Sequence, residues 1–249
     1  MARKSKALIL GVGAERGIGG AASLRFAKEG YHVLVAGRTT AKIGKVVEAV
    51  RRAGGSATAV TVDGTKEDEV IRLFDKAMAD DADGTPADLF VFNMGNNAAV
   101  DFREMTAQHF EESWRVGCFA GFLFGREAMR RLAPLGRGTV LFTGASGSMR
   151  GRPRFAAFNA TKGGLRLLVQ SMAREFGPQG IHVAHTIIDA HIYTGKPDGS
   201  MAEYDHVPGL REQLTREVRP LLIPIGLDPA HPFPQVANKS LNFIVHLSG

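Results

Sequence analysis

The stretch that most constrains the fold is a glycine-rich turn at residues 11–20, which reads GVGAERGIGG. It follows an apolar run at residues 7–10 and opens a helical pattern in which Ile18, Ala22 and Phe26 recur every four residues. An uninterrupted apolar run is typical of a strand that is buried on both faces. A glycine turn between such a strand and a helix presents backbone N–H groups and the positive end of the helix dipole to an anion. We therefore expect a dinucleotide pyrophosphate site here, the alternative being a tight turn that binds nothing.

Beyond this turn, apolar runs alternate with helical patterns, and glycines or prolines separate them. Strands are expected at residues 7–10, 32–36, 57–62, 88–95, 138–143 and 181–188, and the later helices at 41–53, 66–80, 106–132 and 155–176. This order predicts an α/β fold: one Rossmann-like domain with a doubly wound parallel sheet and helices on both faces.

The last part of the chain follows no such pattern. Residues 195–249 are interrupted by prolines, and we expect them to form a substrate lid or an irregular C-terminal region within a single domain over residues 1–249. Within them, residues 243–247 fit either a strand or a helix.

Composition excludes several classes of protein. The net charge is +6, but Lys and Arg are scattered without a basic block, so we expect no nucleic-acid partner. No apolar run is long enough for a membrane span, and the basic start is unlike a signal peptide. The one cysteine, Cys118, rules out an internal disulfide and reads as a small buried residue. A cytoplasmic location follows as the default.

Two arginines bear on the choice of cofactor. Ligands of such sheets bind outside the carboxyl ends of the strands, and an acid after the second strand favours NAD. This chain has Arg38 at that point and no acid, and Arg16 lies within the glycine turn. Guanidinium groups suit the 2′-phosphate of NADP, so NADP(H) is favoured over NAD(H). The alternative is that both arginines are ordinary solvated surface residues.

At this point residues 5–194 resemble the short-chain dehydrogenase/reductase family. Gly13, Gly17, Ile18 and Gly19 resemble its TGxxxGIG turn, and Asn93 and Gly95 lie in a degenerate form of its NNAG motif. The resemblance implies cofactor contacts at Gly13, Arg16, Gly17, Ile18, Gly19, Arg38, Asp63, Asn93, Gly95, Lys162 and Thr194, of which Asp63 matches the adenine-contacting acid, Lys162 the lysine of YxxxK and Thr194 the nicotinamide-contacting threonine.

The catalytic set departs from the family pattern. The family's tyrosine, one helical turn before the lysine, is Phe158 here, and a phenyl ring has no proton to give. The family's serine falls on Ala145 and its asparagine on Gly117. With Lys162 as the family lysine, the candidates for handling the proton are Ser146, Ser148, Asn159, His191 and Tyr193.

These features lead to one interpretation and one rival. The favoured function is hydride transfer between NADP(H) and a small carbonyl or alcohol, with an atypical or impaired proton donor. The rival is a non-catalytic NADP(H)-binding sensor or scaffold. We expect no metal site, because His182 and His185 lie in a strand without further ligands and read as structural. Surplus apolar positions on helices 106–132 and 155–176, together with the resemblance, predict a homodimer or homotetramer.

Overall fold

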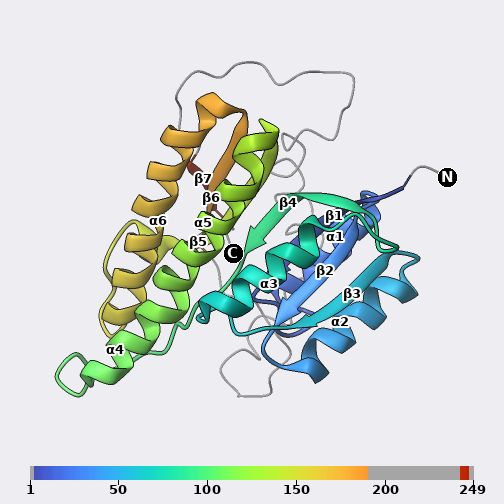
Figure 1. The fold of residues 1–249 in the computed structure, drawn as a ribbon. Coiled ribbons are helices and arrows are strands. Elements are labelled where there is room, and N and C mark those ends of the chain that lie inside the picture. Colours follow the sequence, from blue (N-terminus) through green and yellow to red (C-terminus); the bar gives the residue numbers. More distant parts are fainter. Residues whose placement is uncertain (1–2, 190–241, 247–249) are drawn as a thin grey trace.

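The computed structural model describes residues 3–189 and 242–246, and within them seven strands form one parallel sheet in the order β3-β2-β1-β4-β5-β6-β7 (Figure 1). The strands are β1 (Ser5–Leu10), β2 (His32–Gly37), β3 (Ser56–Thr61), β4 (Thr85–Phe92), β5 (Gly138–Ala145), β6 (Ile181–Asp189) and β7 (Asn242–His246). The predicted Rossmann-like α/β fold is confirmed. The stretch at 243–247, for which the sequence left strand and helix open, falls largely in β7.

The helices lie on both faces of this sheet (Figure 1). They are α1 (Ile18–Lys28), α2 (Thr40–Arg52), α3 (Glu67–Met78), α4 (Ala107–Trp114), α5 (Ala120–Leu132) and α6 (Ala156–Phe176). One core joins α1 and α2 to their face of the sheet, and a second core joins α3, α5 and α6 to the opposite face. In the described part of the chain, no helix is both long and apolar enough to cross a membrane.

Burial explains the strand sequences. Every residue of β2 is buried, as its continuous apolar run predicts for a strand covered on both faces. The outermost strand β3 is more exposed: only Ala57 is buried, and Ala59 and Thr61 are exposed. The second core is rich in phenylalanine, and its rings at Phe74, Phe90 and Phe124 lie within 5.1–6.5 Å of one another, centroid to centroid.

The helical region expected over residues 106–132 is present, but it is not α-helical throughout. A π-helical turn at Arg115–Phe119 lies between α4 and α5. Such turns insert a residue into a helix and are frequent at functional sites. Gly117 in this turn lies against α6, because a Cβ at that position would come within 2.2 Å of Thr161 Cγ2. Hydrophobic periodicity alone does not reveal such a wide turn, since the backbone stays helical through it.

Candidate functional site

The glycine turn after β1 is shaped by close backbone contacts. Gly11 has a φ of +94° and donates its N–H to Ala36 O at 3.0 Å, and a Cβ there would lie 2.5 Å from Asn93 O. Gly17 precedes α1 and has no side chain to cap the helix, so the first N–H groups of α1 face outward. A Cβ on Gly13 would meet nothing within 4 Å. The turn is therefore packed on one side and open on the other, as a phosphate cradle requires.

Asn93 joins the carboxyl ends of three strands. Its Nδ2 donates to Gly11 O at 3.0 Å, and its Oδ1 accepts from Thr143 Oγ1 at 2.9 Å. Gly19 lies beside it, since a Cβ there would be 3.2 Å from Nδ2. The amide that the sequence assigns to the cofactor is thus used to hold β1, β4 and β5 together beneath the turn.

Arg38 and Asp63 meet at the ends of β2 and β3. Asp63 Oδ1 accepts hydrogen bonds from Thr65 N at 3.0 Å and Thr65 Oγ1 at 2.8 Å. Burial acts to raise the pKa of Asp63, but the Thr65 hydrogen bonds and the nearby Arg38 charge outweigh it and lower the pKa. Arg38 is exposed, as is Arg16 in the glycine turn. The adenosine end of the predicted site therefore pairs an ionised carboxylate with exposed guanidinium groups.

Lys162 lies at the centre of the candidate site. Its side chain is buried, and Nζ donates to Met94 O and to Thr143 O, both at 2.9 Å. An ammonium has three donors, so one remains for a ligand. A Cβ on Gly95 would lie 3.2 Å from Nζ, so the glycine leaves the space beside the ammonium clear. Burial lowers the pKa of Lys162 to about 8.

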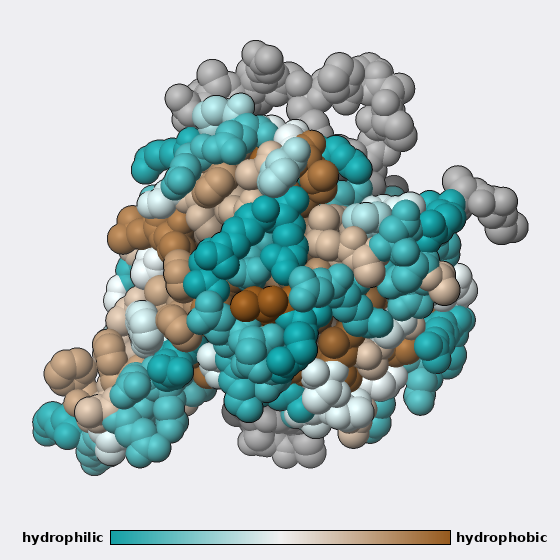
Figure 2. All heavy atoms as spheres, in the orientation of Figure 1, coloured by the Kyte–Doolittle hydropathy of each residue, from teal (hydrophilic) through white to brown (hydrophobic). Residues whose placement is uncertain are grey.

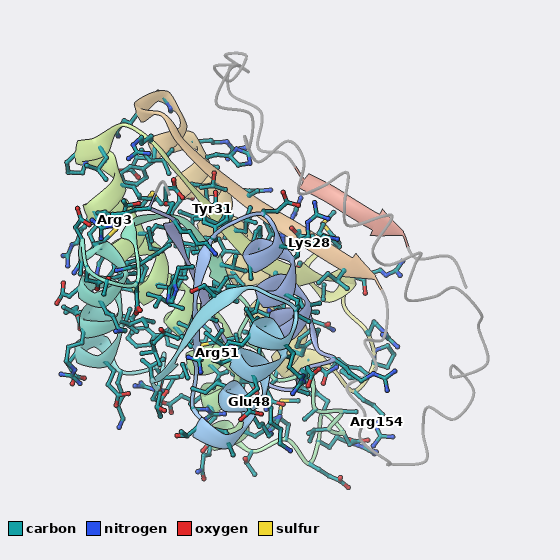
Figure 3. All side chains as sticks on the ribbon, turned by 90° about the vertical axis from the view of Figure 1, so that its right-hand side faces the viewer. Arg3, Lys28, Tyr31, Glu48, Arg51 and Arg154 are labelled. Carbon is teal, nitrogen blue, oxygen red and sulfur yellow. The ribbon has the colours of Figure 1, made fainter. Side chains whose placement is uncertain are left out.

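The loop before α6 fixes where that helix begins. Arg154 adopts a φ of +68°, and its carbonyl accepts from Val100 N at 2.8 Å. Asn159 Nδ2 donates to Arg152 O at 3.3 Å. In Figure 3, Arg154 lies on the side of the molecule toward which the β6 arrow points, at the carboxyl edge of the sheet. This loop therefore fixes the start of α6 and, with it, the position of Phe158 near the beginning of that helix.

The end of β5 and the start of α6 are apolar at the positions where the resemblance leads us to expect proton donors. The Phe158 ring is half-buried and packs near Gly147, where a Cβ would lie 3.1 Å from the ring. Ala145 ends β5, and its N–H donates to Ser148 Oγ at 3.1 Å, so Ser148 is buried in a capping role. Ser146, half-buried, adjoins Gly147 and so lies near the Phe158 ring. Of the predicted serines, Ser146 is the better placed for a ligand.

Position 117 has no room for the family's asparagine. A Cβ on Gly117 would come within 2.2 Å of Thr161 Cγ2, and Thr161 is buried. The side chain of Thr161 therefore occupies the space that a residue at 117 would need. The predicted sites His191, Tyr193 and Thr194 lie outside the described residues. Within the described ranges, no group of three His, Cys, Asp or Glu residues is placed to hold a metal.

Sequence reasoning missed two parts of this site. The carbonyls of Met94 and Thr143 that hold Lys162 are backbone groups, and their only signal is that both residues lie at the ends of predicted strands. His185, interpreted as structural, is buried, yet neither of its ring nitrogens has a hydrogen-bond partner. Burial, followed by the charges of Lys162 and Arg166, lowers the pKa of His185 to about 4.

A family model described as short chain dehydrogenase matches residues 7–192, which include the glycine turn, Asn93 and Lys162. The chain belongs to the short-chain dehydrogenase family. A second model, of the polyphosphate kinase middle domain, matches residues 208–249. That match covers a minor part of the chain and shows no second family.

Relatives of this short-chain dehydrogenase resemble it over the same region. A short-chain dehydrogenase/reductase of Armillaria gallica is 31% identical over 71% of this chain and 67% of its own length. Versicolorin reductase 1 of Dothistroma septosporum is 31% identical over 71% of this chain and 65% of its own length, so the match spans slightly less than two thirds of that relative. A crystal structure of a short-chain dehydrogenase from Rhodopseudomonas palustris is 32% identical, covers 97% of both chains and superposes with a TM-score of 0.71.

Proposed function

We propose that this protein is an NADP(H)-dependent oxidoreductase that transfers a hydride between the cofactor and a small carbonyl or alcohol, without the usual tyrosine proton donor. The cofactor supplies the hydride when it is bound. The protein supplies a cradle for the phosphates at residues 11–19, a guanidinium at Arg38 and an ammonium at Lys162. The proton donor is a group other than residue 158 or a water molecule.

The geometry of Lys162 is the observation that carries this proposal. A buried ammonium is costly unless hydrogen bonds satisfy it, and Lys162 is held by two carbonyls at the carboxyl edge. Its third donor and the clear space at Gly95 fit the hydroxyl groups of a nicotinamide ribose.

The preference for NADP(H) rests on Arg38 and Arg16. Each charge-assisted contact to the 2′-phosphate is worth about 1.5–3 kcal/mol, which is roughly tenfold or more in affinity. Titrations with NADPH and NADH, read by the change in nicotinamide fluorescence, should therefore give a lower Kd for NADPH. Arg38→Ala should remove this preference. The matched control is Arg137→Ala, which deletes an exposed arginine just before β5, at the opposite edge of the sheet. Equal affinities for the two cofactors would refute the preference.

The rival is an NADP(H)-binding sensor or scaffold without turnover. It is favoured by Phe158, Ala145 and Gly117, which together replace the family's tyrosine, serine and asparagine. A panel of small carbonyls and alcohols, followed at the nicotinamide absorbance, separates the two functions. Turnover that falls when Lys162 is replaced supports an enzyme. If turnover also falls when Ser146, His191 or Tyr193 is replaced, that residue is identified as the proton donor. NADPH binding without turnover on any compound supports the rival.

We also propose that the protein is a homodimer or homotetramer that associates through α4, α5 and α6. Large apolar side chains are exposed there: Phe110 is 42%, Trp114 42%, Phe122 40% and Leu167 63% exposed. A hollow of about 600 Å³ between α5 and α6 is lined by Phe122, Leu168 and Met172 among others. Figure 2 shows tan and brown surface over this part of the molecule. Monomeric mass by light scattering at micromolar concentration would refute the assembly.

The role of the C-terminal region is part of the proposal. We infer that residues 1–249 act as one domain, since β7 adds to the sheet beside β6. We also infer that residues 195–249 contribute a substrate lid or an irregular C-terminal region. We propose a cytoplasmic location because a chain with a single cysteine cannot form an internal disulfide. Deletion of residues 208–241, which spares β7, should leave NADPH binding intact and alter turnover. Unchanged turnover would instead favour a segment of separate origin, in line with the polyphosphate kinase match.

A further inference from the structure

The loop between β5 and α6 carries a cluster of positive charge at the carboxyl edge of the sheet. Residues 149–155 read MRGRPRF, and Arg150, Arg152 and Arg154 are all exposed. Residues 128–174 contain no Asp or Glu, so no acid of this loop or of the first turns of α6 offsets the charge. Figure 3 shows Arg154 on the side toward which the β6 arrow points. Arginines therefore border the site on the side where α6 begins.

Arg152 is the member of this cluster whose position is best fixed. Its guanidinium carbon lies 5.1 Å from the centroid of the Phe155 ring, a cation–π contact. Its carbonyl accepts hydrogen bonds from Phe155 N at 3.2 Å and from Asn159 Nδ2 at 3.3 Å. In the part of the chain that the structure describes, Arg152 forms no ion pair, and its side-chain N–H groups make no hydrogen bond. The ring thus holds the face of the guanidinium and leaves its N–H edge for a ligand.

The neighbouring Arg154 differs because an acid lies near it. Hydrogen bonds from Arg103 lower the pKa of Asp101, and the charge of Arg154 contributes to the same shift. The carbonyl of Arg154 also accepts from Val100 N at 2.8 Å, which ties the segment before Asp101 to this loop. The charge of Arg154 is therefore partly offset by a carboxylate.

Arg152 lies at one end of a line of side chains that leads to Lys162. Phe155 precedes the first residue of α6, and Phe158 and Lys162 follow it three and seven residues later. Side chains at this spacing lie on one face of a helix, and a rise of about 1.5 Å per residue separates Phe155 from Lys162 by ~10 Å along the axis. The ammonium is at the cofactor end of this face, and the guanidinium is at the other end.

The chemistry of the guanidinium end suits an oxyanion. A guanidinium is planar, remains charged, and presents N–H pairs that match two oxygens of a carboxylate or of a phosphate. Because the Phe155 ring already restricts the Arg152 side chain, less conformational entropy is lost when an anion binds. The other arginines of the loop add an attractive field that a neutral compound would not feel.

We propose that Arg152 determines specificity, and that the substrates are carbonyl compounds or alcohols that carry an anionic group, a carboxylate or a phosphate, several bonds from the reacting carbon. The anionic group binds the N–H edge of Arg152, and the reacting carbon lies toward Lys162. This inference rests on the function proposed above, because it assigns the substrate class of the same site.

The test compares matched pairs of charged and neutral compounds in the presence of saturating NADPH. The carboxylate pairs are 4-oxopentanoate and 6-oxoheptanoate against their methyl esters, and the phosphate pair is dihydroxyacetone phosphate against dihydroxyacetone. The readout is kcat/KM at the nicotinamide absorbance, or calorimetric affinity for the NADPH complex where no turnover occurs. The charged member of at least one class should be favoured roughly tenfold or more, and the two classes distinguish a carboxylate from a phosphate.

Three variants locate the source of this preference. Arg152→Gln keeps a planar polar group without the charge and should reduce the preference about tenfold. Arg154→Gln removes the same charge two residues later and should reduce it less, because Asp101 already offsets that arginine. The matched control for net charge is Arg137→Gln, at the opposite edge of the sheet, which should keep the full preference.

The outcomes separate this inference from the function on which it rests. A wild type that binds NADPH but favours the charged member of no pair would overturn the inference and leave the proposed function in place. An equal loss of preference in Arg152→Gln and Arg154→Gln would show that the overall charge of the loop, and not Arg152, selects the anion, which also overturns it. A wild type that binds no NADPH would refute the proposed function, and the substrate class with it.

Discussion

The carboxyl edge of the sheet has two halves, a cofactor half and a proton half, which differ in the functional groups of their side chains. In the cofactor half, around residues 11–19, Arg38 and Asp63, glycines open the surface and polar groups are fixed in place. In the proton half, the end of β5 and the start of α6 present Ala145 and Phe158. Lys162 belongs to both halves, because it bonds carbonyls from the turn after β4 and from β5.

Under the function proposed above, binding and proton transfer are separable within one scaffold. In the second half, α6 begins at Ala156, and Lys162 is held by the carbonyls of Met94 and Thr143. What has changed is the functional groups on that backbone. Losing a positioned general acid typically costs about 10²–10⁴ in rate and leaves binding in place. The predictions below test how far the two halves are independent.

The largest effect is expected from restoring the missing groups. Phe158 lies one turn before Lys162 on the same face of α6, so a phenol there should meet the same ligand, and Lys162 should favour its ionised form. Phe158→Tyr combined with Ala145→Ser should therefore raise NADPH-dependent carbonyl reduction by about 10²–10⁴-fold. Turnover is measured at the nicotinamide absorbance.

The matched control is Phe155→Tyr, which adds a phenol three residues earlier, at the residue that precedes α6. It should leave turnover unchanged. If the double variant binds NADPH normally but gains no activity on a broad carbonyl panel, residues 145 and 158 do not lie beside the same ligand as Lys162. If wild type turns over and the double variant gains little, a different residue already supplies the proton.

The next largest effect is expected in how the free energy of unfolding depends on pH, because Lys162 is a buried titratable group. Its pKa is lowered from 10.5 to about 8 by burial, so between these values the unfolded chain binds a proton that the folded protein has lost. Stability due to this group therefore rises with pH from about 8 to about 10.5, by up to about 3 kcal/mol. Lys162→Met should lack this rise.

Urea unfolding of wild type and of Lys162→Met at pH 7 and pH 10 gives the change in the free energy of unfolding with pH for each protein. Tyr31, whose pKa burial raises to about 12, opposes the trend at high pH but is present in both proteins and cancels. The same pH dependence in wild type and Lys162→Met would mean that the ammonium is not held as the structure indicates.

A third prediction tests whether the π-helical turn excludes the family's asparagine. Gly117→Asn should push the new Cβ into Thr161 Cγ2 and cost about 1–3 kcal/mol of stability, as overpacking of a core does. Adding Thr161→Ser removes that methyl group and should recover most of the loss. Thermal unfolding of the single and double variants measures both. An unchanged stability of Gly117→Asn would show that the π-helical turn and α6 separate easily, and that the asparagine is missing for some other reason.

The sequence was sufficient for the parts of the fold that depend on local patterns. Continuous apolar runs such as residues 32–36 predicted buried strands, and glycines such as Gly30 and Gly54 marked where helices stop. The π-helical turn was missed because it leaves the helical dihedral angles and the apolar spacing almost unchanged. Lys162 was found by its resemblance to the lysine of the family's YxxxK motif, and Phe158 by its spacing from Lys162 on the same helix.

The partners of Lys162 were not predictable in the same way. Met94 and Thr143 contribute backbone oxygens, which any residue type would supply, and only the register of β4 and β5 brings them together. His185 was interpreted as structural because it has no metal-ligand neighbours in sequence. Its ring packs over Gly144 of the neighbouring strand β5, which is a tertiary contact and leaves no mark in the sequence.

The smallest effect is expected at the open side of the glycine turn. Gly13 meets no protein atom within 4 Å of an added Cβ, and its φ lies outside the left-handed region, so Gly13→Ala should fold with an unchanged Tm. If phosphates lie in that open space, the methyl group should displace them and weaken NADPH binding by roughly tenfold, equivalent to about 1.4 kcal/mol. Gly44→Ala is the control, since Gly44 is equally unobstructed but lies within α2, away from the turn, where alanine should add about 0.5–1 kcal/mol of stability. Calorimetric titration with NADPH compares the two variants. Equal affinities in Gly13→Ala, Gly44→Ala and wild type would place the phosphates elsewhere, and the cofactor half would then rest on Arg38 and Lys162 alone.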